Sequence, residues 1–205
     1  MHAPGIAEIR ASAESGDSSA QVALGDDYAT GRGVTQSYAE AARWYGRAAE
    51  DGDQAAQCNL GTLYLAGQGV ARDYAKAVEL FRKSAAQESP KAAFSLGLMY
   101  MNGFGVNQDL ATGRQWYLKA AERGSPEAML RLGEIYHDGT GVKCDLVEAY
   151  KWMHLTINFT DEGNHPGIES RARAALKELK SQLSRQEMEE AERRTEEWFA
   201  VYQES

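Results

Sequence analysis

Few residues in this chain have the types and spacing that catalysis or metal binding requires. The four histidines are His2, His137, His154 and His165, and no two of them are one helical turn apart, as in a zinc-binding H-E-x-x-H segment. The two cysteines do not form a C-x-x-C pair either. The sequence therefore predicts no metal site.

The cysteines stand in different kinds of segment. Cys58 occupies an apolar position of a predicted helix, whereas Cys144 occupies a predicted loop. Because these environments differ, we expect no disulfide between them and two free thiols without a catalytic role. Such cysteine usage fits a reducing compartment but does not require one.

Two further motifs resemble catalytic or nucleotide-binding signatures only in part. G-x-G pairs recur four times, but they follow predicted helices, whereas the dinucleotide fingerprint follows a strand and has a third glycine. Ser95 lies in Phe-Ser-Leu-Gly, without the G-x-S-x-G context of a hydrolase nucleophile and without an aligned base. We therefore predict no cofactor and no enzymatic activity.

Composition narrows the choice of partners. The 205 residues include 22 Lys and Arg against 30 Asp and Glu, for a formal net charge of -8. This balance argues against nucleic acid and anionic lipid, which both need clustered cations. No apolar run approaches the ~20 residues that span a bilayer, and Met1 to Glu8 do not resemble a signal peptide. We expect a cytoplasmic protein, or a periplasmic or secreted one if a signal peptide has been removed.

A repeat organises most of the chain. Leu-Gly pairs begin at residues 24, 60, 96 and 132, an even spacing of 36 residues. Around each pair the string L-G-x-x-Y-x-x-G-x-G-V returns, with its tyrosine at 28, 64, 100 and 136. So many matched positions in four copies indicate a repeat architecture.

Each copy predicts two helices. The first contains A-x-x-x-L-G-x-x-Y, whose residues share one face, and its glycine predicts a close approach between helices. The G-x-G-V loop ends it, because glycine tolerates positive φ. Glu40 and Glu148 each follow a cap residue by three positions, as in a capping box. Capping residues precede the first helices (Asp17, Asp53, Ser89, Ser125) and the second helices (Ser37, Asp73, Asp109, Asp145).

This unit resembles the SEL-one-like repeat (SLR) family, a relative of the tetratricopeptide repeats. The resemblance covers residues 17–157, and it implies an all-α, right-handed α-α superhelix (solenoid) of four 36-residue helix-turn-helix repeats with helical caps. Relatives are similar to adaptor scaffolds in signalling, membrane-protein quality control, bacterial envelope assembly and host interaction. A few bacterial relatives resemble penicillin-binding proteins in ligand preference, but they carry regularly paired cysteines that this chain lacks.

The ends of the array need caps, because an open repeat exposes its apolar face. Residues 1–16 contain a predicted capping helix from Ile6 to Ala13, and residues 158–205 form a predicted C-terminal helical cap. In the latter, a loop over 158–167 precedes a helix over 168–179 and another from Ser184 to about Tyr202. The last helix has an acidic side and an aromatic side, so it is either a polar-faced cap or a partner-binding or dimerising helix.

Candidate ligand-binding residues follow if the first helices line the concave face, as in tetratricopeptide repeats. One row opposite the core side holds Ala23, Asn59, Ser95 and Arg131, and the neighbouring row holds Asp26, Thr62, Leu98 and Glu134. His137 could face the same groove or simply be solvated. The rows vary while the core rows repeat, as in a surface that recognises an irregular partner, although ordinary exposed positions are the alternative. Asn59 resembles the backbone-holding asparagine of peptide-binding tetratricopeptide grooves.

The function predicted from these features is a protein-interaction scaffold that binds a peptide or protein segment on its concave face. Two alternatives stay open: a bacterial β-lactam-interacting hydrolase like some cysteine-rich relatives, and a structural protein that self-assembles through its C-terminal helices.

Overall fold

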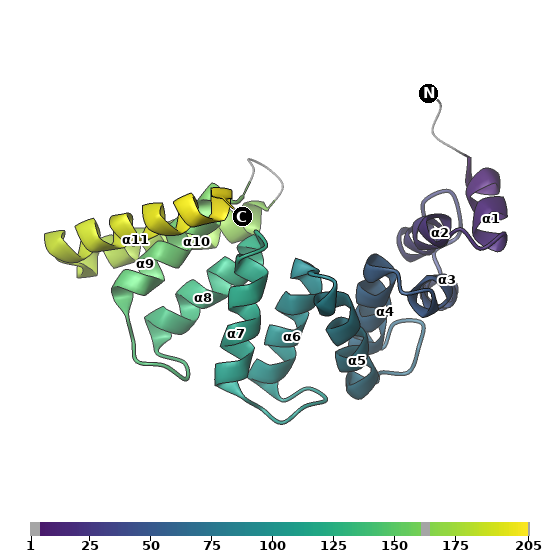
Figure 1. Ribbon diagram of the computed structural model, residues 1–205, viewed down its shortest axis with the longest axis horizontal. Coiled ribbons are helices and arrows are strands. Elements are labelled where there is room, and N and C mark those ends of the chain that lie inside the picture. Colours follow the sequence, from purple (N-terminus) through teal and green to yellow (C-terminus); the bar gives the residue numbers. More distant parts are fainter. Residues whose placement is uncertain (1–4, 161–164, 205) are drawn as a thin grey trace. The chain divides into compact units, whose positions relative to one another are not determined.

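The computed structural model describes residues 5–160 and 165–204, which fold into eleven helices without a strand (Figure 1). The predicted all-α class is confirmed. The helices are α1 (Ile6–Glu14), α2 (Ser18–Thr30), α3 (Tyr38–Glu50), α4 (Gln54–Ala66), α5 (Tyr74–Ala86), α6 (Pro90–Asn102), α7 (Leu110–Ala121), α8 (Pro126–Asp138), α9 (Leu146–Asn158), α10 (Pro166–Gln182) and α11 (Arg185–Glu204).

The helices form two compact units, Met1–Gln108 with α1 to α6 and Asp109–Ser205 with α7 to α11. In the first unit, each helix packs against the next one along the chain. In the second unit, α7 packs on α8 and α8 on α9, and α9 then contacts both α10 and α11. Each helix thus buries its apolar side against neighbours in sequence, as in a repeat protein.

The predicted N-caps of all eight repeat helices are confirmed. In α2 to α9, the side chain before the helix accepts a hydrogen bond from the backbone N–H three residues later. The predicted capping boxes at Ser37 and Asp145 do not form. The backbone N–H of each residue donates instead to a repeat tyrosine of the preceding helix, through the carbonyl of Tyr28 or Tyr136. These helix carbonyls therefore accept the hydrogen bonds that the glutamate side chains would accept in a capping box.

The glycine of the Leu-Gly pair lies where two helices touch. A Cβ on Gly61 would lie 2.9 Å from Phe81 Cε1, and a Cβ on Gly25 would lie 2.5 Å from Tyr45 Cε1. The predicted close approach is confirmed, and it joins the first helix of a copy to the second helix of the same copy. The loop glycines have positive φ values, 70° at Gly67 for example, as the turn requires.

The core follows the repeated leucines. Leu24, Leu60, Leu96 and Leu132 are all buried. Tyr28 and Tyr64 pack against the buried core, and all four repeat tyrosines are half-buried. Their hydroxyls lie near the surface, where arginines of the preceding helix reach two of them, Tyr28 and Tyr100.

Helices flank the repeats at both ends. Helix α1 forms where it was predicted and packs on α2. Helix α9 extends through Asn158, and α10 runs from Pro166 to Gln182, longer than predicted at both ends. Proline is tolerated at the first helical position, which explains the earlier start of α10. Part of the predicted loop, residues 161–164, lies outside the described residues.

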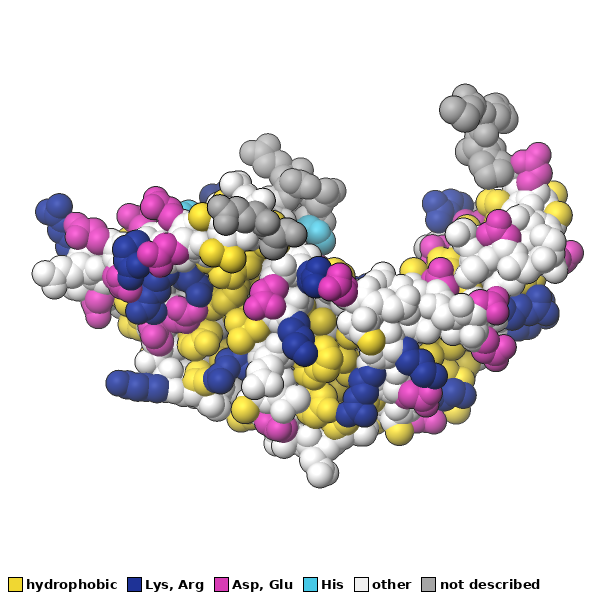
Figure 2. Space-filling view, in the orientation of Figure 1, with side chains coloured by type: hydrophobic (Ala, Val, Ile, Leu, Met, Phe, Trp, Pro, Cys, Tyr) yellow, Lys and Arg dark blue, Asp and Glu magenta, His cyan; other side chains and the backbone are white. Residues whose placement is uncertain are grey.

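Helix α11 starts with the predicted capping box. The Ser184 backbone N–H donates to Glu187 Oε2 at 2.9 Å, and the Glu187 N–H donates to Ser184 Oγ at 3.3 Å. The solvent side of α11 is less acidic than expected, because Arg193 and Arg194 pair with Glu190, and Figure 2 shows both signs of charge mixed there.

The aromatic side of α11 packs on α9. Trp198, Phe199 and Tyr202 all place their rings within 6 Å of Phe159, at centroid distances of 5.7, 5.8 and 4.8 Å. Trp198 also lies edge-on to Trp152 at 5.8 Å. The three rings of α11 are half-buried within the second unit, so part of the aromatic surface of α11 is used by the unit itself.

Candidate functional site

The candidate residues of the first unit lie on one side of two first helices. Asn59 and Thr62 are on α4, and Ser95 and Leu98 are one repeat later on α6. All four side chains are half-buried, so each keeps surface available to a partner. With Asp26 of α2 and Lys91 of α6, they form what we call the first-helix face.

Hydrogen bonds connect this face from repeat to repeat. Asn59 Nδ2 donates to Asp26 Oδ1 at 3.3 Å, and Asn59 Oδ1 accepts from Lys91 Nζ at 3.1 Å. A carboxylate, an amide and an ammonium group therefore link α2, α4 and α6. We call Asp26, Asn59 and Lys91 the polar ladder.

Tyr45 anchors the carboxylate end of the polar ladder. Its hydroxyl donates to Asp26 Oδ1 at 2.6 Å. Burial raises the pKa of Tyr45, and the hydrogen bond to Asp26 raises that pKa further. The hydroxyl consequently stays protonated and holds the carboxylate in place.

The small polar residues of the first-helix face are hydrogen-bonded within their own helices. Thr62 Oγ1 donates to the Cys58 carbonyl at 3.0 Å, and Ser95 Oγ donates to the Lys91 carbonyl at 2.9 Å. Since a hydroxyl has one donor, both oxygens are left to a ligand as acceptors only. Lys91 keeps two of its three N–H donors beyond the bond to Asn59.

The candidate residues of the second unit lie on α8 beside α10. Arg131 Nη1 donates to Glu134 Oε2 at 2.9 Å, and Arg171 of α10 binds the other oxygen of the same carboxylate. His137 pairs through Nδ1 with Asp138 Oδ1 at 2.7 Å. A hollow of about 330 Å³ between α8 and α10 is lined by Glu134, His137 and Arg171, among others. Two guanidinium groups thus share one carboxylate.

Sequence reasoning missed Lys91, Tyr45 and Arg171. Lys91 lies one helical turn before Ser95, so the repeat register could have indicated it. Tyr45 belongs to a core pair of the second helix, and only the fold shows that its hydroxyl reaches Asp26. The predicted extension of the row from Ser95 to Arg131 passes from one unit to the other and stays a prediction.

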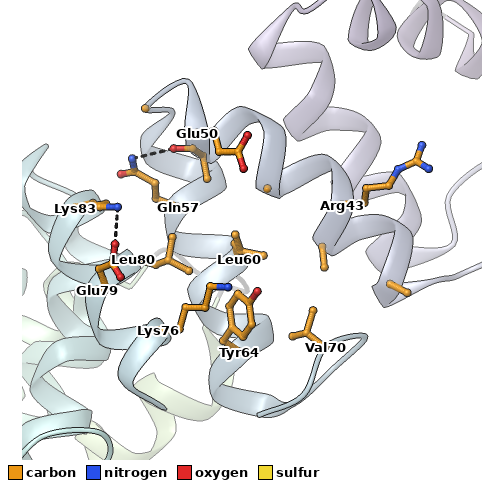
Figure 3. Close-up of a pocket in the computed structure, with 15 residues that line it drawn as sticks. Arg43, Glu50, Gln57, Leu60, Tyr64, Val70, Lys76, Glu79, Leu80 and Lys83 are labelled. Atoms are coloured by element: carbon orange, nitrogen blue, oxygen red, sulfur yellow. Dashed lines mark hydrogen bonds and ion pairs between the residues drawn. The ribbon is translucent and has the colours of Figure 1, made fainter. Parts of the chain in front are cut away.

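A larger hollow, of about 750 Å³, opens between α3 and α5 (Figure 3). We call it the α3–α5 hollow. Leu60 and Tyr64 line it from α4, on the side of that helix away from Asn59. Gly46 of α3 and Leu80 of α5 form its walls, and its charged residues are Arg43, Glu50, Lys76, Glu79 and Lys83. The sequence had not indicated this site.

The described residues contain no group of three or more His, Cys, Asp or Glu side chains placed to hold a metal ion. Both cysteines are free thiols, Cys58 buried and Cys144 exposed. Within the same residues, no helix has the length and apolarity to cross a membrane.

Comparison with known proteins identifies the repeat. A family model described as the Sel1 repeat matches residues 18–53, 54–89, 90–125 and 126–157. A search of curated proteins found no sequence match. The four matched segments coincide with the four predicted copies, so the predicted resemblance and the helical solenoid class are confirmed.

Solved structures share the fold. A protective antigen of uropathogenic Escherichia coli with an SLR fold is 32% identical with a TM-score of 0.84, and the match covers 96% of this chain but 41% of the antigen. A Sel1 repeat protein from Oxalobacter formigenes is 27% identical with a TM-score of 0.72, covering 87% of this chain and 78% of that one. An immunity protein from Pseudomonas aeruginosa, 16% identical with a TM-score of 0.55 over 85% of this chain and 73% of its own, shares the fold alone. With four consecutive matches that cover most of its length, the chain belongs to the Sel1 repeat family.

Proposed function

We propose that the protein is an interaction scaffold that holds an extended segment of a partner protein against the first-helix face. Sel1 repeats typically mediate protein interactions, and their fold is a scaffold type, not that of a known enzyme family. The observation that carries the proposal is the polar ladder, which presents Asp26, Asn59 and Lys91 on three consecutive first helices.

The polar ladder suits a peptide backbone because its groups are already fixed. Tyr45 holds Asp26, and Asp26 and Lys91 hold Asn59, so little conformational entropy is lost at the scaffold when a ligand binds. The free donors of Lys91 match carbonyl or carboxylate oxygens of the partner. In the second unit, Arg131 and Arg171 around Glu134 would bind a further carboxylate of the partner.

A matched pair of lysines tests this proposal. Peptides selected from a random library on the wild-type protein are titrated by calorimetry into Asn59→Ala, Lys91→Ala and the control Lys177→Ala, an exposed lysine of α10. We expect each of the first two changes to weaken binding about tenfold, at ~1–3 kcal/mol per lost hydrogen bond to a charged or buried group. Equal melting temperatures verify the fold. Equal affinities of the wild type, Asn59→Ala and Lys91→Ala would contradict the proposal.

Self-association through α11 is a second candidate function. Val201 is 69% exposed, the highest exposure of a large hydrophobic side chain among the described residues, and it lines a hollow with Trp198 and Tyr202. If copies associate there, Val201→Glu should lower the mass measured by light scattering. An equal, monomeric mass for wild type and variant would exclude this function.

A further inference from the structure

The α3–α5 hollow occupies a helix junction that is filled elsewhere in the same unit. One repeat earlier, between α1 and α3, three of the corresponding positions carry larger residues. Ala42 is matched there by Ile6, Gly46 by Arg10 and Leu80 by Trp44. Each pair is separated by 36 residues, the length of one repeat. The α3–α5 hollow is therefore open because the three side chains at this junction are smaller than their counterparts.

The filled junction shows what that space accepts. Trp44 is only 2% exposed, and it packs in one cluster with Ala13, Leu24 and Ile6. Arg10 Nη2 donates to the Tyr28 hydroxyl at 2.8 Å. The next arginine in this register, Arg82, donates to the hydroxyl of Tyr100, the tyrosine of the following repeat, at 2.7 Å. At the α3–α5 junction, glycine replaces the arginine and leucine replaces the tryptophan.

Gly46 has no structural reason to be glycine. Its φ is not positive, and a Cβ there would meet no atom within 4 Å. This differs from Gly61, which is held against Phe81. Since glycine inside a helix costs about 1 kcal/mol relative to alanine, Gly46 lowers stability without improving the packing of α3. What it provides is the open space.

Charges around the α3–α5 hollow favour an acidic ligand. Lys76 Nζ lies 4.6 Å from the centre of the Tyr64 ring, which lines the hollow. Figure 3 shows the two side chains next to each other. Of the two acids that line the hollow, Glu79 is paired with Lys83 at 2.6 Å. Arg43 is likewise paired with Glu40 at 3.6 Å, so among the described residues that line the hollow Lys76 is the cation without an acidic partner, and it is available to a carboxylate of the ligand.

We propose that the α3–α5 hollow is a second binding site, which takes the aromatic side chain of a partner protein, a tryptophan above all, from a segment with adjacent acidic residues. The indole would lie against Leu60, Tyr64 and Leu80, as Trp44 lies against its own cluster. A neighbouring carboxylate would pair with Lys76. The volume of about 750 Å³ is within the range of ligand pockets and accommodates the ring with part of its backbone.

Short peptides test the two parts of the proposal on the full chain. Acetyl-Asp-Trp-Asp-amide is titrated up to about 5 mM, with binding followed by backbone NMR shifts, because one buried side chain supports affinities near the millimolar range. Acetyl-Asp-Leu-Asp-amide tests the ring, and acetyl-Lys-Trp-Lys-amide tests the charge. We expect saturable shifts in α3 and α5, and affinities at least about fivefold lower for each control peptide.

Two variants close the site with residues that this chain uses elsewhere. Gly46→Arg and Leu80→Trp should each weaken the acidic tryptophan peptide at least tenfold while the melting temperature stays equal or rises. Asn59→Ala, on the other side of α4, should leave this affinity unchanged, so the result is independent of the first-helix face. The proposal is overturned if the peptide produces no saturable shift, or if both filled variants bind it as well as the wild type.

Discussion

Gly69 lies directly against the backbone of Tyr38, the first residue of α3 in the preceding repeat. A Cβ at residue 69 would lie 2.2 Å from the Tyr38 carbonyl carbon, and the φ of Gly69 is 69°. The equivalent Gly105 has the same relation to Tyr74, at 2.6 Å. The second glycine of the loop therefore lets the loop lie against the second helix of the preceding repeat, in addition to making the turn.

Two glycine-to-alanine changes should have opposite effects. Gly69→Ala should cost about 2–5 kcal/mol, because it combines a strained φ with a clash against backbone. Gly46→Ala should raise stability by up to about 1 kcal/mol, because it removes a helix-interior glycine without a clash. Urea unfolding of both variants measures the difference, and equal effects would show that the loop contact is unimportant.

Leucines of the repeated core row should differ in cost according to their surroundings. Leu96 is fully buried, whereas Leu60 is 8% exposed and borders the α3–α5 hollow. Leu96→Ala should cost about 2–5 kcal/mol and Leu60→Ala an amount near the lower end of that range. A loss below about 0.5 kcal/mol at both positions would contradict the assignment of this row to the core.

The two thiols should react at very different rates. Cys144 is exposed, with its Sγ 3.1 Å from the His137 carbonyl oxygen, whereas Cys58 is buried, and burial raises the pKa of its thiol. A thiol reagent should modify one cysteine quickly in the native protein and the second only on unfolding. Cys144→Ser should abolish the fast phase, and detection of a Cys58–Cys144 disulfide would refute the prediction.

Stability should fall as the pH drops below about 6.5, the ordinary value for histidine. Burial lowers the pKa of His154, with Lys180 of α10 acting in the same direction and Glu192 of α11 opposing it. Its Nδ1 is buried without a hydrogen-bond partner. Because the unfolded chain takes up the proton more readily, the stabilisation is complete above the unfolded pKa and is lost below it.

The measurement for His154 is the free energy of unfolding at about pH 7.5 and about pH 5.5. His154→Phe keeps an aromatic ring beside Tyr150 and should show a smaller loss between the two pH values than the wild type. An identical loss in both proteins would mean that another group controls this pH range.

Much of the fold could be predicted because its signals are local and repeated. Asp53 and Ser89 act on backbone N–H groups only three residues away, so their capping role needs no knowledge of tertiary structure. The capping box at Ser37 failed because the competing acceptor, the Tyr28 carbonyl, is on another helix. A rule based on residues that are close in sequence does not take that carbonyl acceptor into account.

The site was less predictable because it depends on which helices are neighbours. Helical periodicity placed Asn59 and Ser95 on one side of their helices, but not Lys91 within 3.1 Å of Asn59. The register also showed glycine at 46 where arginine stands at 10 and 82. That difference became informative only once the fold placed Tyr64 and Leu80 around the same space.

The contact of α11 with α9 has a consequence during protein synthesis. Trp152 and Phe159 are translated before Trp198 and Tyr202, the rings that later cover them. Until residues 185–204 leave the ribosome, the aromatic side of α9 faces water and is a target for chaperones and for aggregation. Premature termination or proteolytic cleavage between α10 and α11 would leave the sequence of the repeats intact. The aromatic side of α9 would then stay exposed to water permanently.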